Sequence, residues 1–267
     1  MNSWEQIIYF LQGEMVRPEI YGWFHLLWII SSIIVLILLL CFGKNKEKKL
    51  KIILFVYGFG ALILEILKQI IWSFDYDMVN NIVSWDYNWY AFPFQLCTTP
   101  IFASIICLFV KKGKAREMIL SYMAYITILG SLATYLYPES CFVKTILVNI
   151  HTMYLHCGSL VVSLYLLLSG EVEVKFKNVV NGYIIFLFFA FLAEIMNIVM
   201  YQSGILGSES FNMFYISPYF ISSLPLFDII QKNTPFIIFL LIYLLSILLG
   251  ALVIYGVSKF ISKFIKK

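Results

Sequence analysis

The sequence predicts an all-α protein, a polytopic bundle of transmembrane helices that forms a single domain over residues 1–267. Hydrophobic residues make up 61% of the 267 positions and charged residues only 13%. The mean hydropathy is +0.89, a value that the surface of a soluble domain of this size could not accommodate. Long apolar runs follow one another along the chain, and lysine and arginine gather in alternate connections between them. This alternation is typical of membrane proteins.

Apolar runs of about 20 residues, the length with which a helix crosses a bilayer, occur seven times. We therefore predict seven transmembrane helices. Their ranges are 23–42, 52–74, 89–110, 117–137, 146–169, 179–201 and 235–257.

Lysine and arginine indicate the orientation. The connections after the first, third and fifth spans and the C-terminal tail hold most of these residues, whereas the alternate connections hold Arg17, Lys144 and Lys232. By the positive-inside rule, the N-terminus lies outside and the C-terminus inside. The net charge of +4 therefore reflects membrane orientation and does not indicate a nucleic-acid partner. The basic residues expected inside are Lys44, Lys46, Lys48, Lys49, Lys51, Lys111, Lys112, Lys114, Arg116, Lys175, Lys177, Lys259, Lys263, Lys266 and Lys267.

Three segments outside the spans have compositions of their own. Residues 1–22 lack the basic start and cleavage site of a signal peptide, and apolar residues from Trp4 to Leu11 recur at helical spacing. This segment is expected to form a short helix at the outer interface. Residues 202–234 are too aromatic for a flexible linker, so we expect a lid segment over the outer mouth, because irregular backbone at this depth must be sheltered by protein. Residues 258–267 are expected to form a basic amphipathic tail on the inner leaflet.

Residues 92–100, with the sequence Phe-Pro-Phe-Gln-Leu-Cys-Thr-Thr-Pro, are the least lipid-like part of any predicted span. Pro100 cannot donate a hydrogen bond to the carbonyl of Leu96. A helix through this stretch should therefore kink beside Cys97, unless a threonine hydroxyl satisfies the freed carbonyl. Polar groups inside a membrane are costly and usually face the bundle interior or a watery cavity. The candidate site therefore begins at Cys97.

Polar side chains from several spans lie at nearly the same depth as Cys97, in the outer half of the bilayer, when depth is counted at roughly 1.5 Å per residue. A shared cavity explains such a layer better than independent polar residues do. Glu65 and Lys68 are three residues apart, so either they neutralise each other or Glu65 acts directly, and the sequence leaves both interpretations open. The predicted substrate-binding or cavity-lining residues are Glu65, Gln69, Gln95, His151, Glu194, Asn197 and Asn212.

Cys97 and His156 form the predicted catalytic pair. A thiol in apolar surroundings is unreactive unless a base or a cation favours its thiolate, and a neighbouring imidazole supplies such a base. The third and fifth spans run in the same direction and place the two residues at nearly equal depth. Packing remains open as the alternative role of Cys97. Because His151 and His156 are five residues apart and not four, we expect no metal, and no cofactor motif is present.

The motifs Pro93-Phe-Gln-Leu-Cys97, His156 followed by a small residue, and Asn212-Met-Phe resemble those of the YwaF-like bacterial membrane proteins. That family is similar to the animal transmembrane protein 164, and the resemblance covers most of the chain. It implies an acyltransferase that moves fatty acyl chains between phospholipids, with Cys97 as the acyl acceptor and His156 as its base. A histidine often stands in that family where this chain has Gln95, so one donor differs here.

Two functions use the same polar layer. The first is a lipid acyltransferase or lipid hydrolase, in which Cys97 takes an acyl group as a thioester and a lysolipid or water takes it onward. The second is a receptor or transporter that binds a small or lipidic ligand in the cavity without covalent chemistry. Acylation of Cys97 distinguishes them. In both cases we expect a multi-pass protein of the cell membrane whose partners are membrane lipids, without nucleic acid.

Overall fold

The computed structural model describes residues 2–42, 45–77, 79–80 and 82–265. Lys44, Lys266 and Lys267, three of the basic residues expected inside, lie outside the described residues. The α-helices are α1 (Ser3–Leu11), α2 (Trp23–Cys41), α3 (Lys46–Ile71), α4 (Thr99–Phe109), α5 (Lys114–Tyr125), α6 (Thr127–Leu136), α7 (Ile146–Leu168), α8 (Phe176–Gln202), α9 (Phe227–Asn233) and α10 (Phe236–Ile265). Strands β1 (Phe74–Asp77) and β2 (Ile82–Trp85) and the short 3-10 helices η1 (Trp89–Ala91), η2 (Glu139–Cys141) and η3 (Met213–Tyr215) complete the described elements.

Six helical stretches among the described residues are long and apolar enough to cross a membrane. They are α2, α3, the α5–α6 pair, α7, α8 and α10, and they coincide with six of the seven predicted spans. The α5–α6 pair is interrupted only at Ile126. The length and composition of these helices make the chain a multi-pass membrane protein.

The prediction of a continuous helix over residues 89–110 is wrong. Only α4, with 11 residues, is α-helical there. At 1.5 Å per residue it covers roughly 16 Å, about half of the hydrocarbon core. Pro100 lies in the first turn of α4, where its missing N–H leaves no helical hydrogen bond unmade. The proline therefore marks where a helix begins and does not kink one.

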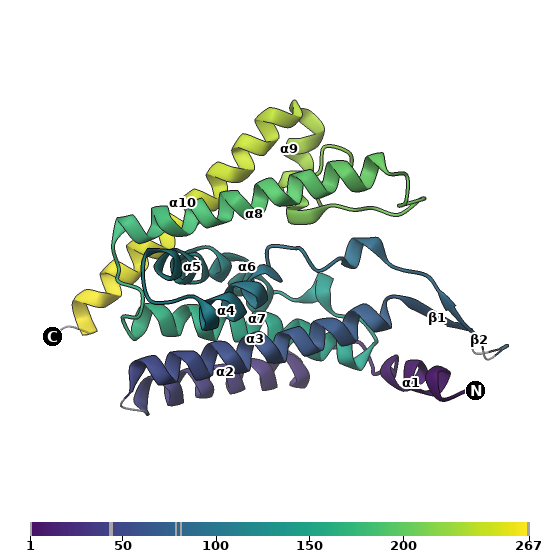
Figure 1. Cartoon of the computed structure of the whole chain (residues 1–267), viewed down its shortest axis with the longest axis horizontal. Coiled ribbons are helices and arrows are strands. Elements are labelled where there is room, and N and C mark those ends of the chain that lie inside the picture. The colour runs from purple at the N-terminus through teal and green to yellow at the C-terminus, as the bar shows by residue number, and fades with distance from the viewer. Residues whose placement is uncertain (1, 43–44, 78, 81, 266–267) are drawn as a thin grey trace.

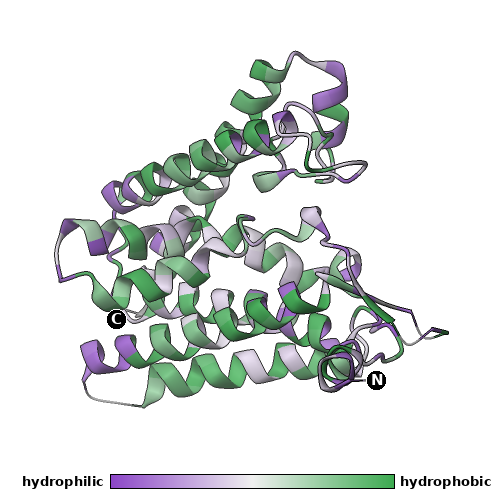
Figure 2. Cartoon of the chain, turned by 45° about the vertical axis from the view of Figure 1, so that its right-hand side comes forward, coloured by the Kyte–Doolittle hydropathy of each residue, from purple (hydrophilic) through white to green (hydrophobic). Residues whose placement is uncertain are grey.

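Helix α7 is the centre of the bundle and packs against α2, α3, α5 and α6. Helix α8 packs on α5, and α10 packs on α8, so the C-terminal helices form a separate layer above α4–α6 (Figure 1). The two chain termini lie at opposite ends of the bundle (Figure 1). Hydrophilic residues gather at the helix ends and connections, and hydrophobic residues extend along the helices (Figure 2).

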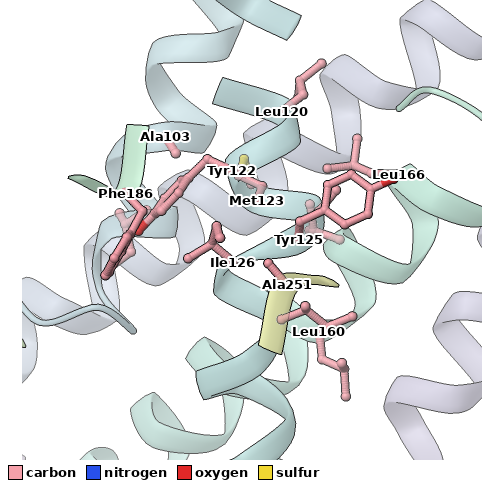
Figure 3. Close-up of a cluster of buried hydrophobic side chains, with 14 of the residues drawn as sticks. Ala103, Leu120, Tyr122, Met123, Tyr125, Ile126, Leu160, Leu166, Phe186 and Ala251 are labelled. Carbon is pink, nitrogen blue, oxygen red and sulfur yellow. The ribbon is translucent and has the colours of Figure 1, made fainter. Parts of the chain in front are cut away.

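The largest group of buried apolar side chains is centred on α5. Tyr122, Met123 and Tyr125 are at most 1% exposed and lie among side chains of α4, α7, α8 and α10 (Figure 3). Gly182 lets α8 approach α5 closely, because a Cβ there would lie 2.7 Å from the carbonyl oxygen of Ser121. The core therefore joins the C-terminal layer to the rest of the bundle.

The connections at the end that holds the N-terminus are structured. The helix expected within residues 1–22 is α1, and it begins with a capping box between Asn2 and Glu5. Strands β1 and β2 form an antiparallel hairpin after α3 that pairs Phe74 with Trp85, which the sequence analysis did not predict. At the other terminus, residues 258–265 of the segment expected as a tail continue α10 as one helix.

Candidate functional site

Glu65 is the centre of a buried charged network between α3 and α7. Its carboxylate lies 2.7 Å from Lys68 Nζ and 2.7 Å from His151 Nε2. Gln69 donates from Nε2 to Glu65 Oε1 at 2.7 Å. Glu65, Lys68 and His151 are 3%, 7% and 5% exposed. Glu65, Lys68 and Gln69 reach one another because residues three and four apart share a helix face, and α7 supplies the imidazole.

The connection between α3 and α4 covers one end of this network. Gln69 Nε2 also donates to the Ala91 carbonyl at 2.8 Å, and the Tyr87 hydroxyl donates to Gln69 Oε1 at 2.7 Å. Burial, followed by the nearby carboxylates, raises the pKa of Tyr87 to about 12, so this hydroxyl remains a donor at neutral pH. Lys68 Nζ lies 5.4 Å from the centroid of the Trp72 ring, a favourable cation–π distance. The network thus joins α3 and α7 to the segment that leads into residues 92–98.

A pocket of 330 Å³ lies beside the network. Glu65, Gln69 and Ser73 supply its polar lining, and Pro93 and Phe102 are among the apolar residues around them. Two of the predicted cavity-lining residues, Glu65 and Gln69, therefore border a pocket.

Cys97 lies in the turn that precedes α4, and its thiol is free and partly buried. The Thr99 hydroxyl donates to the Leu96 carbonyl at 2.8 Å, the group to which Pro100 cannot donate. The same hydroxyl lies 2.5 Å from the Tyr122 hydroxyl. A threonine therefore satisfies the freed carbonyl, as one alternative of the sequence analysis required. The thiol is left at the N-terminal end of α4, where the helix dipole favours a thiolate.

The surroundings of Cys97 connect it to the charged network. Its thiol lies within electrostatic reach of Lys68 and Glu65. The buried hydroxyls of Tyr57 and Tyr122 are also within electrostatic reach of it. The Lys68 charge is itself balanced by the Glu65 carboxylate, 2.7 Å away.

His156 lies on α7, 7% exposed, and its Nδ1 is buried without a hydrogen-bond partner. His151 and His156 are five residues apart, so they point in directions roughly 140° apart around the helix. Only His151 faces Glu65. Among the described residues no hydrogen bond joins Cys97 to His156, so their pairing stays a prediction.

Gln95 and Asn197 hold the backbone of the lid segment from two sides. Gln95 donates from Nε2 to the Asn212 carbonyl at 3.0 Å and accepts from the Phe214 N–H at 2.8 Å. Asn197 on α8 donates to the Met213 carbonyl at 3.1 Å and accepts from the Met213 N–H at 2.7 Å. Phe214 has a φ of 58°, a left-handed conformation that costs a non-glycine residue about 1–2 kcal/mol. The two amides therefore hold a strained turn in place.

Asn212 and Gln231 hold the rest of the lid segment in the same way. Asn212 accepts from the Ser217 N–H at 2.8 Å and donates to the Phe220 carbonyl at 3.1 Å. Gln231 on α9 accepts from the Ser222 N–H at 2.7 Å and donates to the Ser217 carbonyl at 2.9 Å. The sequence analysis missed Gln231, because an amide in a short polar helix carries no signal of a backbone partner.

Glu194 lies on α8, three residues before Asn197, and the two side chains interact. Glu194 is half-buried, and one carboxylate oxygen is buried without a hydrogen-bond partner. Among the described residues no three His, Cys, Asp or Glu side chains group as a metal site requires. The predicted polar residues thus form two groups. The first is Glu65, Gln69 and His151, and the second is Gln95, Asn197 and Asn212. Cys97 lies two positions after Gln95 in the chain and within electrostatic reach of Glu65.

The model of the TMEM164 family matches residues 20–253. This range starts before α2 and ends within α10, so it includes Cys97, both histidines of α7 and the lid segment. No curated protein and no solved structure matches the chain.

Proposed function

Since the chain belongs to the TMEM164 family, we propose that it is a membrane-embedded lipid acyltransferase or lipid hydrolase that carries an acyl group on Cys97. One observation supports this most strongly. The free Cys97 thiol lies in the turn directly before α4, within the range that the family model matches. A helix N-terminus favours negative charge, and the thiolate is the nucleophilic form of cysteine.

In the proposed reaction, His156 accepts the thiol proton and the Cys97 thiolate attacks the ester carbonyl carbon of a phospholipid. The tetrahedral intermediate collapses, the carbon–oxygen ester bond breaks, and the leaving lysophospholipid oxygen takes the proton from His156. The acyl group then remains on sulfur as a thioester. A hydroxyl of a second lysophospholipid, or water, gives its proton to His156 and attacks the thioester carbonyl. Cys97 leaves as a thiolate and takes the proton back from His156, so the cycle closes without a cofactor.

The charged network has a supporting role in this proposal. His151 and Lys68 both bind Glu65, which holds the three side chains together as one buried group between α3 and α7. We therefore assign His151 to the network and His156 to proton transfer.

We further propose seven crossings of the cell membrane, with the N-terminus outside and the C-terminus inside. The termini lie at opposite ends of the bundle (Figure 1), as an odd number of crossings requires. Residues 89–98 together with α4 would make the third crossing. Irregular backbone is tolerated at this depth where protein shelters it, and here Phe92 packs on Phe211 of the lid segment, with ring centroids 5.5 Å apart.

Tags test this topology. A tag after Lys46 or Lys263 should be protected from an impermeant reagent applied outside, and a tag near Ser208 should react. A reactive tag after Lys263 would contradict the seven-crossing topology.

The activity is tested with purified protein in phospholipid vesicles. Cys97→Ala, His156→Ala and the double variant should lose acyl transfer to similar extents, because residues that act as a unit are not additive. His151→Gln, which keeps a donor for Glu65, is the matched histidine control and should retain most of the activity. Mass spectrometry should find an acyl group on the peptide that contains Cys97. Full activity of Cys97→Ala would refute the proposal.

The alternative is a receptor or transporter that binds a small or lipidic ligand without covalent chemistry. The pocket of 330 Å³ beside Glu65 and Gln69 favours it. This alternative predicts that lipid co-purifies with the protein, that Cys97 stays unmodified, and that Glu65→Gln weakens ligand binding while Cys97→Ala does not.

A further inference from the structure

A second cavity, a groove of 340 Å³, lies between α2, α3 and α7. Apolar side chains form most of its walls, and its hydroxyl groups are largely occupied. Ser32 donates to the Ile29 carbonyl at 2.8 Å, Tyr154 to the Val56 carbonyl at 2.8 Å, and Tyr57 to the Leu155 carbonyl at 3.4 Å. The groove therefore offers a ligand hydrocarbon contact and few free polar groups. The apolar lining includes Trp28, Val35, Leu39, Ile53, Val56 and Val161.

Two tyrosines and a glycine shape one wall of the groove. The rings of Tyr57 and Tyr154 lie stacked, with centroids 6.4 Å apart and an interplanar angle of 13°. Gly158 lets the Tyr57 ring lie against α7, since a Cβ at that position would be 2.7 Å from the ring. The wall is thus a pair of flat aromatic surfaces on tightly packed helices.

Tyr57 also places the groove along α3. Its side chain lines the groove and is only 4% exposed. Tyr57 lies eight residues from Glu65 on α3, roughly 12 Å along the helix axis. The groove therefore lies about two helical turns from the charged network, on the side away from the hairpin.

The length of the groove fits one kind of occupant. Trp28 and Leu39 both line it and are 11 residues apart on α2, roughly 16 Å along the axis. One leaflet of a bilayer contributes about half of a hydrocarbon core of about 30 Å. The groove is thus about as long as the acyl layer of a single leaflet.

We propose that this groove binds one fatty acyl chain of the phospholipid substrate. The inference rests on the proposed function, because it names where a chain of that substrate lies during transfer. The chain is held by apolar contact, so the groove selects acyl chains by length and not by headgroup. Since lipid tails are as apolar as the groove, the selection comes from packing against its walls and from its length.

The binding test uses nanodiscs of phosphatidylcholine that contain a phosphatidylcholine with a diazirine near the end of one acyl chain. Illumination should label peptides of α2 and α7 that line the groove. Val35→Trp fills the groove and should reduce this labelling severalfold, because the indole takes space that the chain needs. Ile34→Trp is the matched control, since Val35 and Ile34 are 45% and 51% exposed but Ile34 does not line the groove. A diazirine fatty acid should label the groove more weakly than the phospholipid does.

A second pair keeps the test decisive if Val35→Trp does not fold. Val56→Trp fills the groove from α3, and Phe55→Trp is its control; Val56 and Phe55 are 57% and 55% exposed. Equal labelling of a filled variant and its control, or labelling no stronger than at other lipid-facing peptides, would overturn the proposal. Stronger labelling by the free fatty acid than by the phospholipid would also overturn it.

Two readouts separate this inference from the proposed function. Cys97→Ala should be labelled like the wild type, because the groove does not need the thiol. In the wild type, the thioester on Cys97 should carry mainly long chains, and Val35→Trp should shift it to shorter ones. Groove labelling that Val35→Trp reduces, without any thioester on Cys97, would refute the proposed activity and leave a lipid-chain site. A thioester whose chain length does not respond to Val35→Trp would refute the groove as the acyl site.

Discussion

Replacing Glu65 by glutamine tests the charged network at its centre. The substitution keeps the size of the side chain and removes its charge. Lys68, 7% exposed and 2.7 Å from the carboxylate, would then be a buried cation without a counter-charge. Removing one partner of a buried ion pair typically costs about 3–5 kcal/mol. We therefore expect Glu65→Gln to lower the free energy of unfolding by about 3–5 kcal/mol, which is more than a hundredfold in the folded-to-unfolded ratio.

A double-mutant cycle separates this effect from loss of packing. Lys68→Met alone should also be destabilising, since it leaves the Glu65 carboxylate with His151 and Gln69 only. The double variant Glu65→Gln/Lys68→Met carries no buried charge at the pair. It should be more stable than either single variant, because replacing a whole buried ion pair is often nearly neutral. The assay is unfolding in mixed micelles, followed by the intensity of tryptophan fluorescence.

Glu194→Gln is the matched control. Glu194 is also a glutamate within a predicted span, but it is half-buried and one carboxylate oxygen is buried without a hydrogen-bond partner. Removing its charge should change the free energy of unfolding by less than about 1 kcal/mol, as substitutions away from paired buried groups do. If Glu65→Gln proved as mild as Glu194→Gln, or if the double variant were no more stable than the single variants, the network would not have the energetic role given to it.

Three further predictions concern other parts of the bundle. Gln95→Ala leaves two backbone groups of the lid turn unpaired and should destabilise the fold by about 1–3 kcal/mol per group, with faster proteolysis of the lid segment. Gly158→Ala places a methyl group against the Tyr57 ring and should cost about 1–3 kcal/mol through overpacking, measured as the unfolding midpoint. Burial raises the pKa of Tyr87 to about 12, so its stabilising contribution should be full below the ordinary tyrosine pKa of about 10 and should be lost as pH rises through 12. Absorbance of tyrosinate, with Tyr87→Phe as reference, checks this, and titration of Tyr87 at its ordinary pKa would contradict it.

Six of the seven spans predicted from the sequence are long helices in the structure. The prediction failed at the third span for a physical reason. Apolar composition indicates that a segment can partition into a membrane, and residues 89–110 are apolar enough to do so. A helix also needs an unbroken series of backbone donors, and Pro100 has none to give. Proline is tolerated in the first helical turn, so the helix starts at Thr99. The signal was present in the sequence, since a proline shortly after a threonine is as typical of a helix start as of a kink.

The candidate site was predictable where its contacts are local. Glu65, Lys68 and Gln69 share a helix face by spacing alone, and the structure joins them through hydrogen bonds and an ion pair. The contact between Glu65 and His151 depends on the rotation of α7 against α3, which spacing within one helix does not determine. Composition also does not distinguish an amide that binds a ligand from one that binds backbone, and Gln95 is hydrogen-bonded to backbone.

The amide contacts explain how irregular backbone can lie beside Cys97 in a membrane protein. Neither residues 92–98 nor the turn at 212–214 forms a regular helix or strand, so each needs partners for its backbone groups. Gln95 belongs to the first segment and satisfies two backbone groups of the second. Only Leu96 separates Gln95 from Cys97, so the segment that carries the thiol is hydrogen-bonded to the lid segment. If the lid segment moves to admit a phospholipid in the proposed reaction, the movement must either break these two hydrogen bonds or displace the thiol, so lid position and thiol position would be coupled.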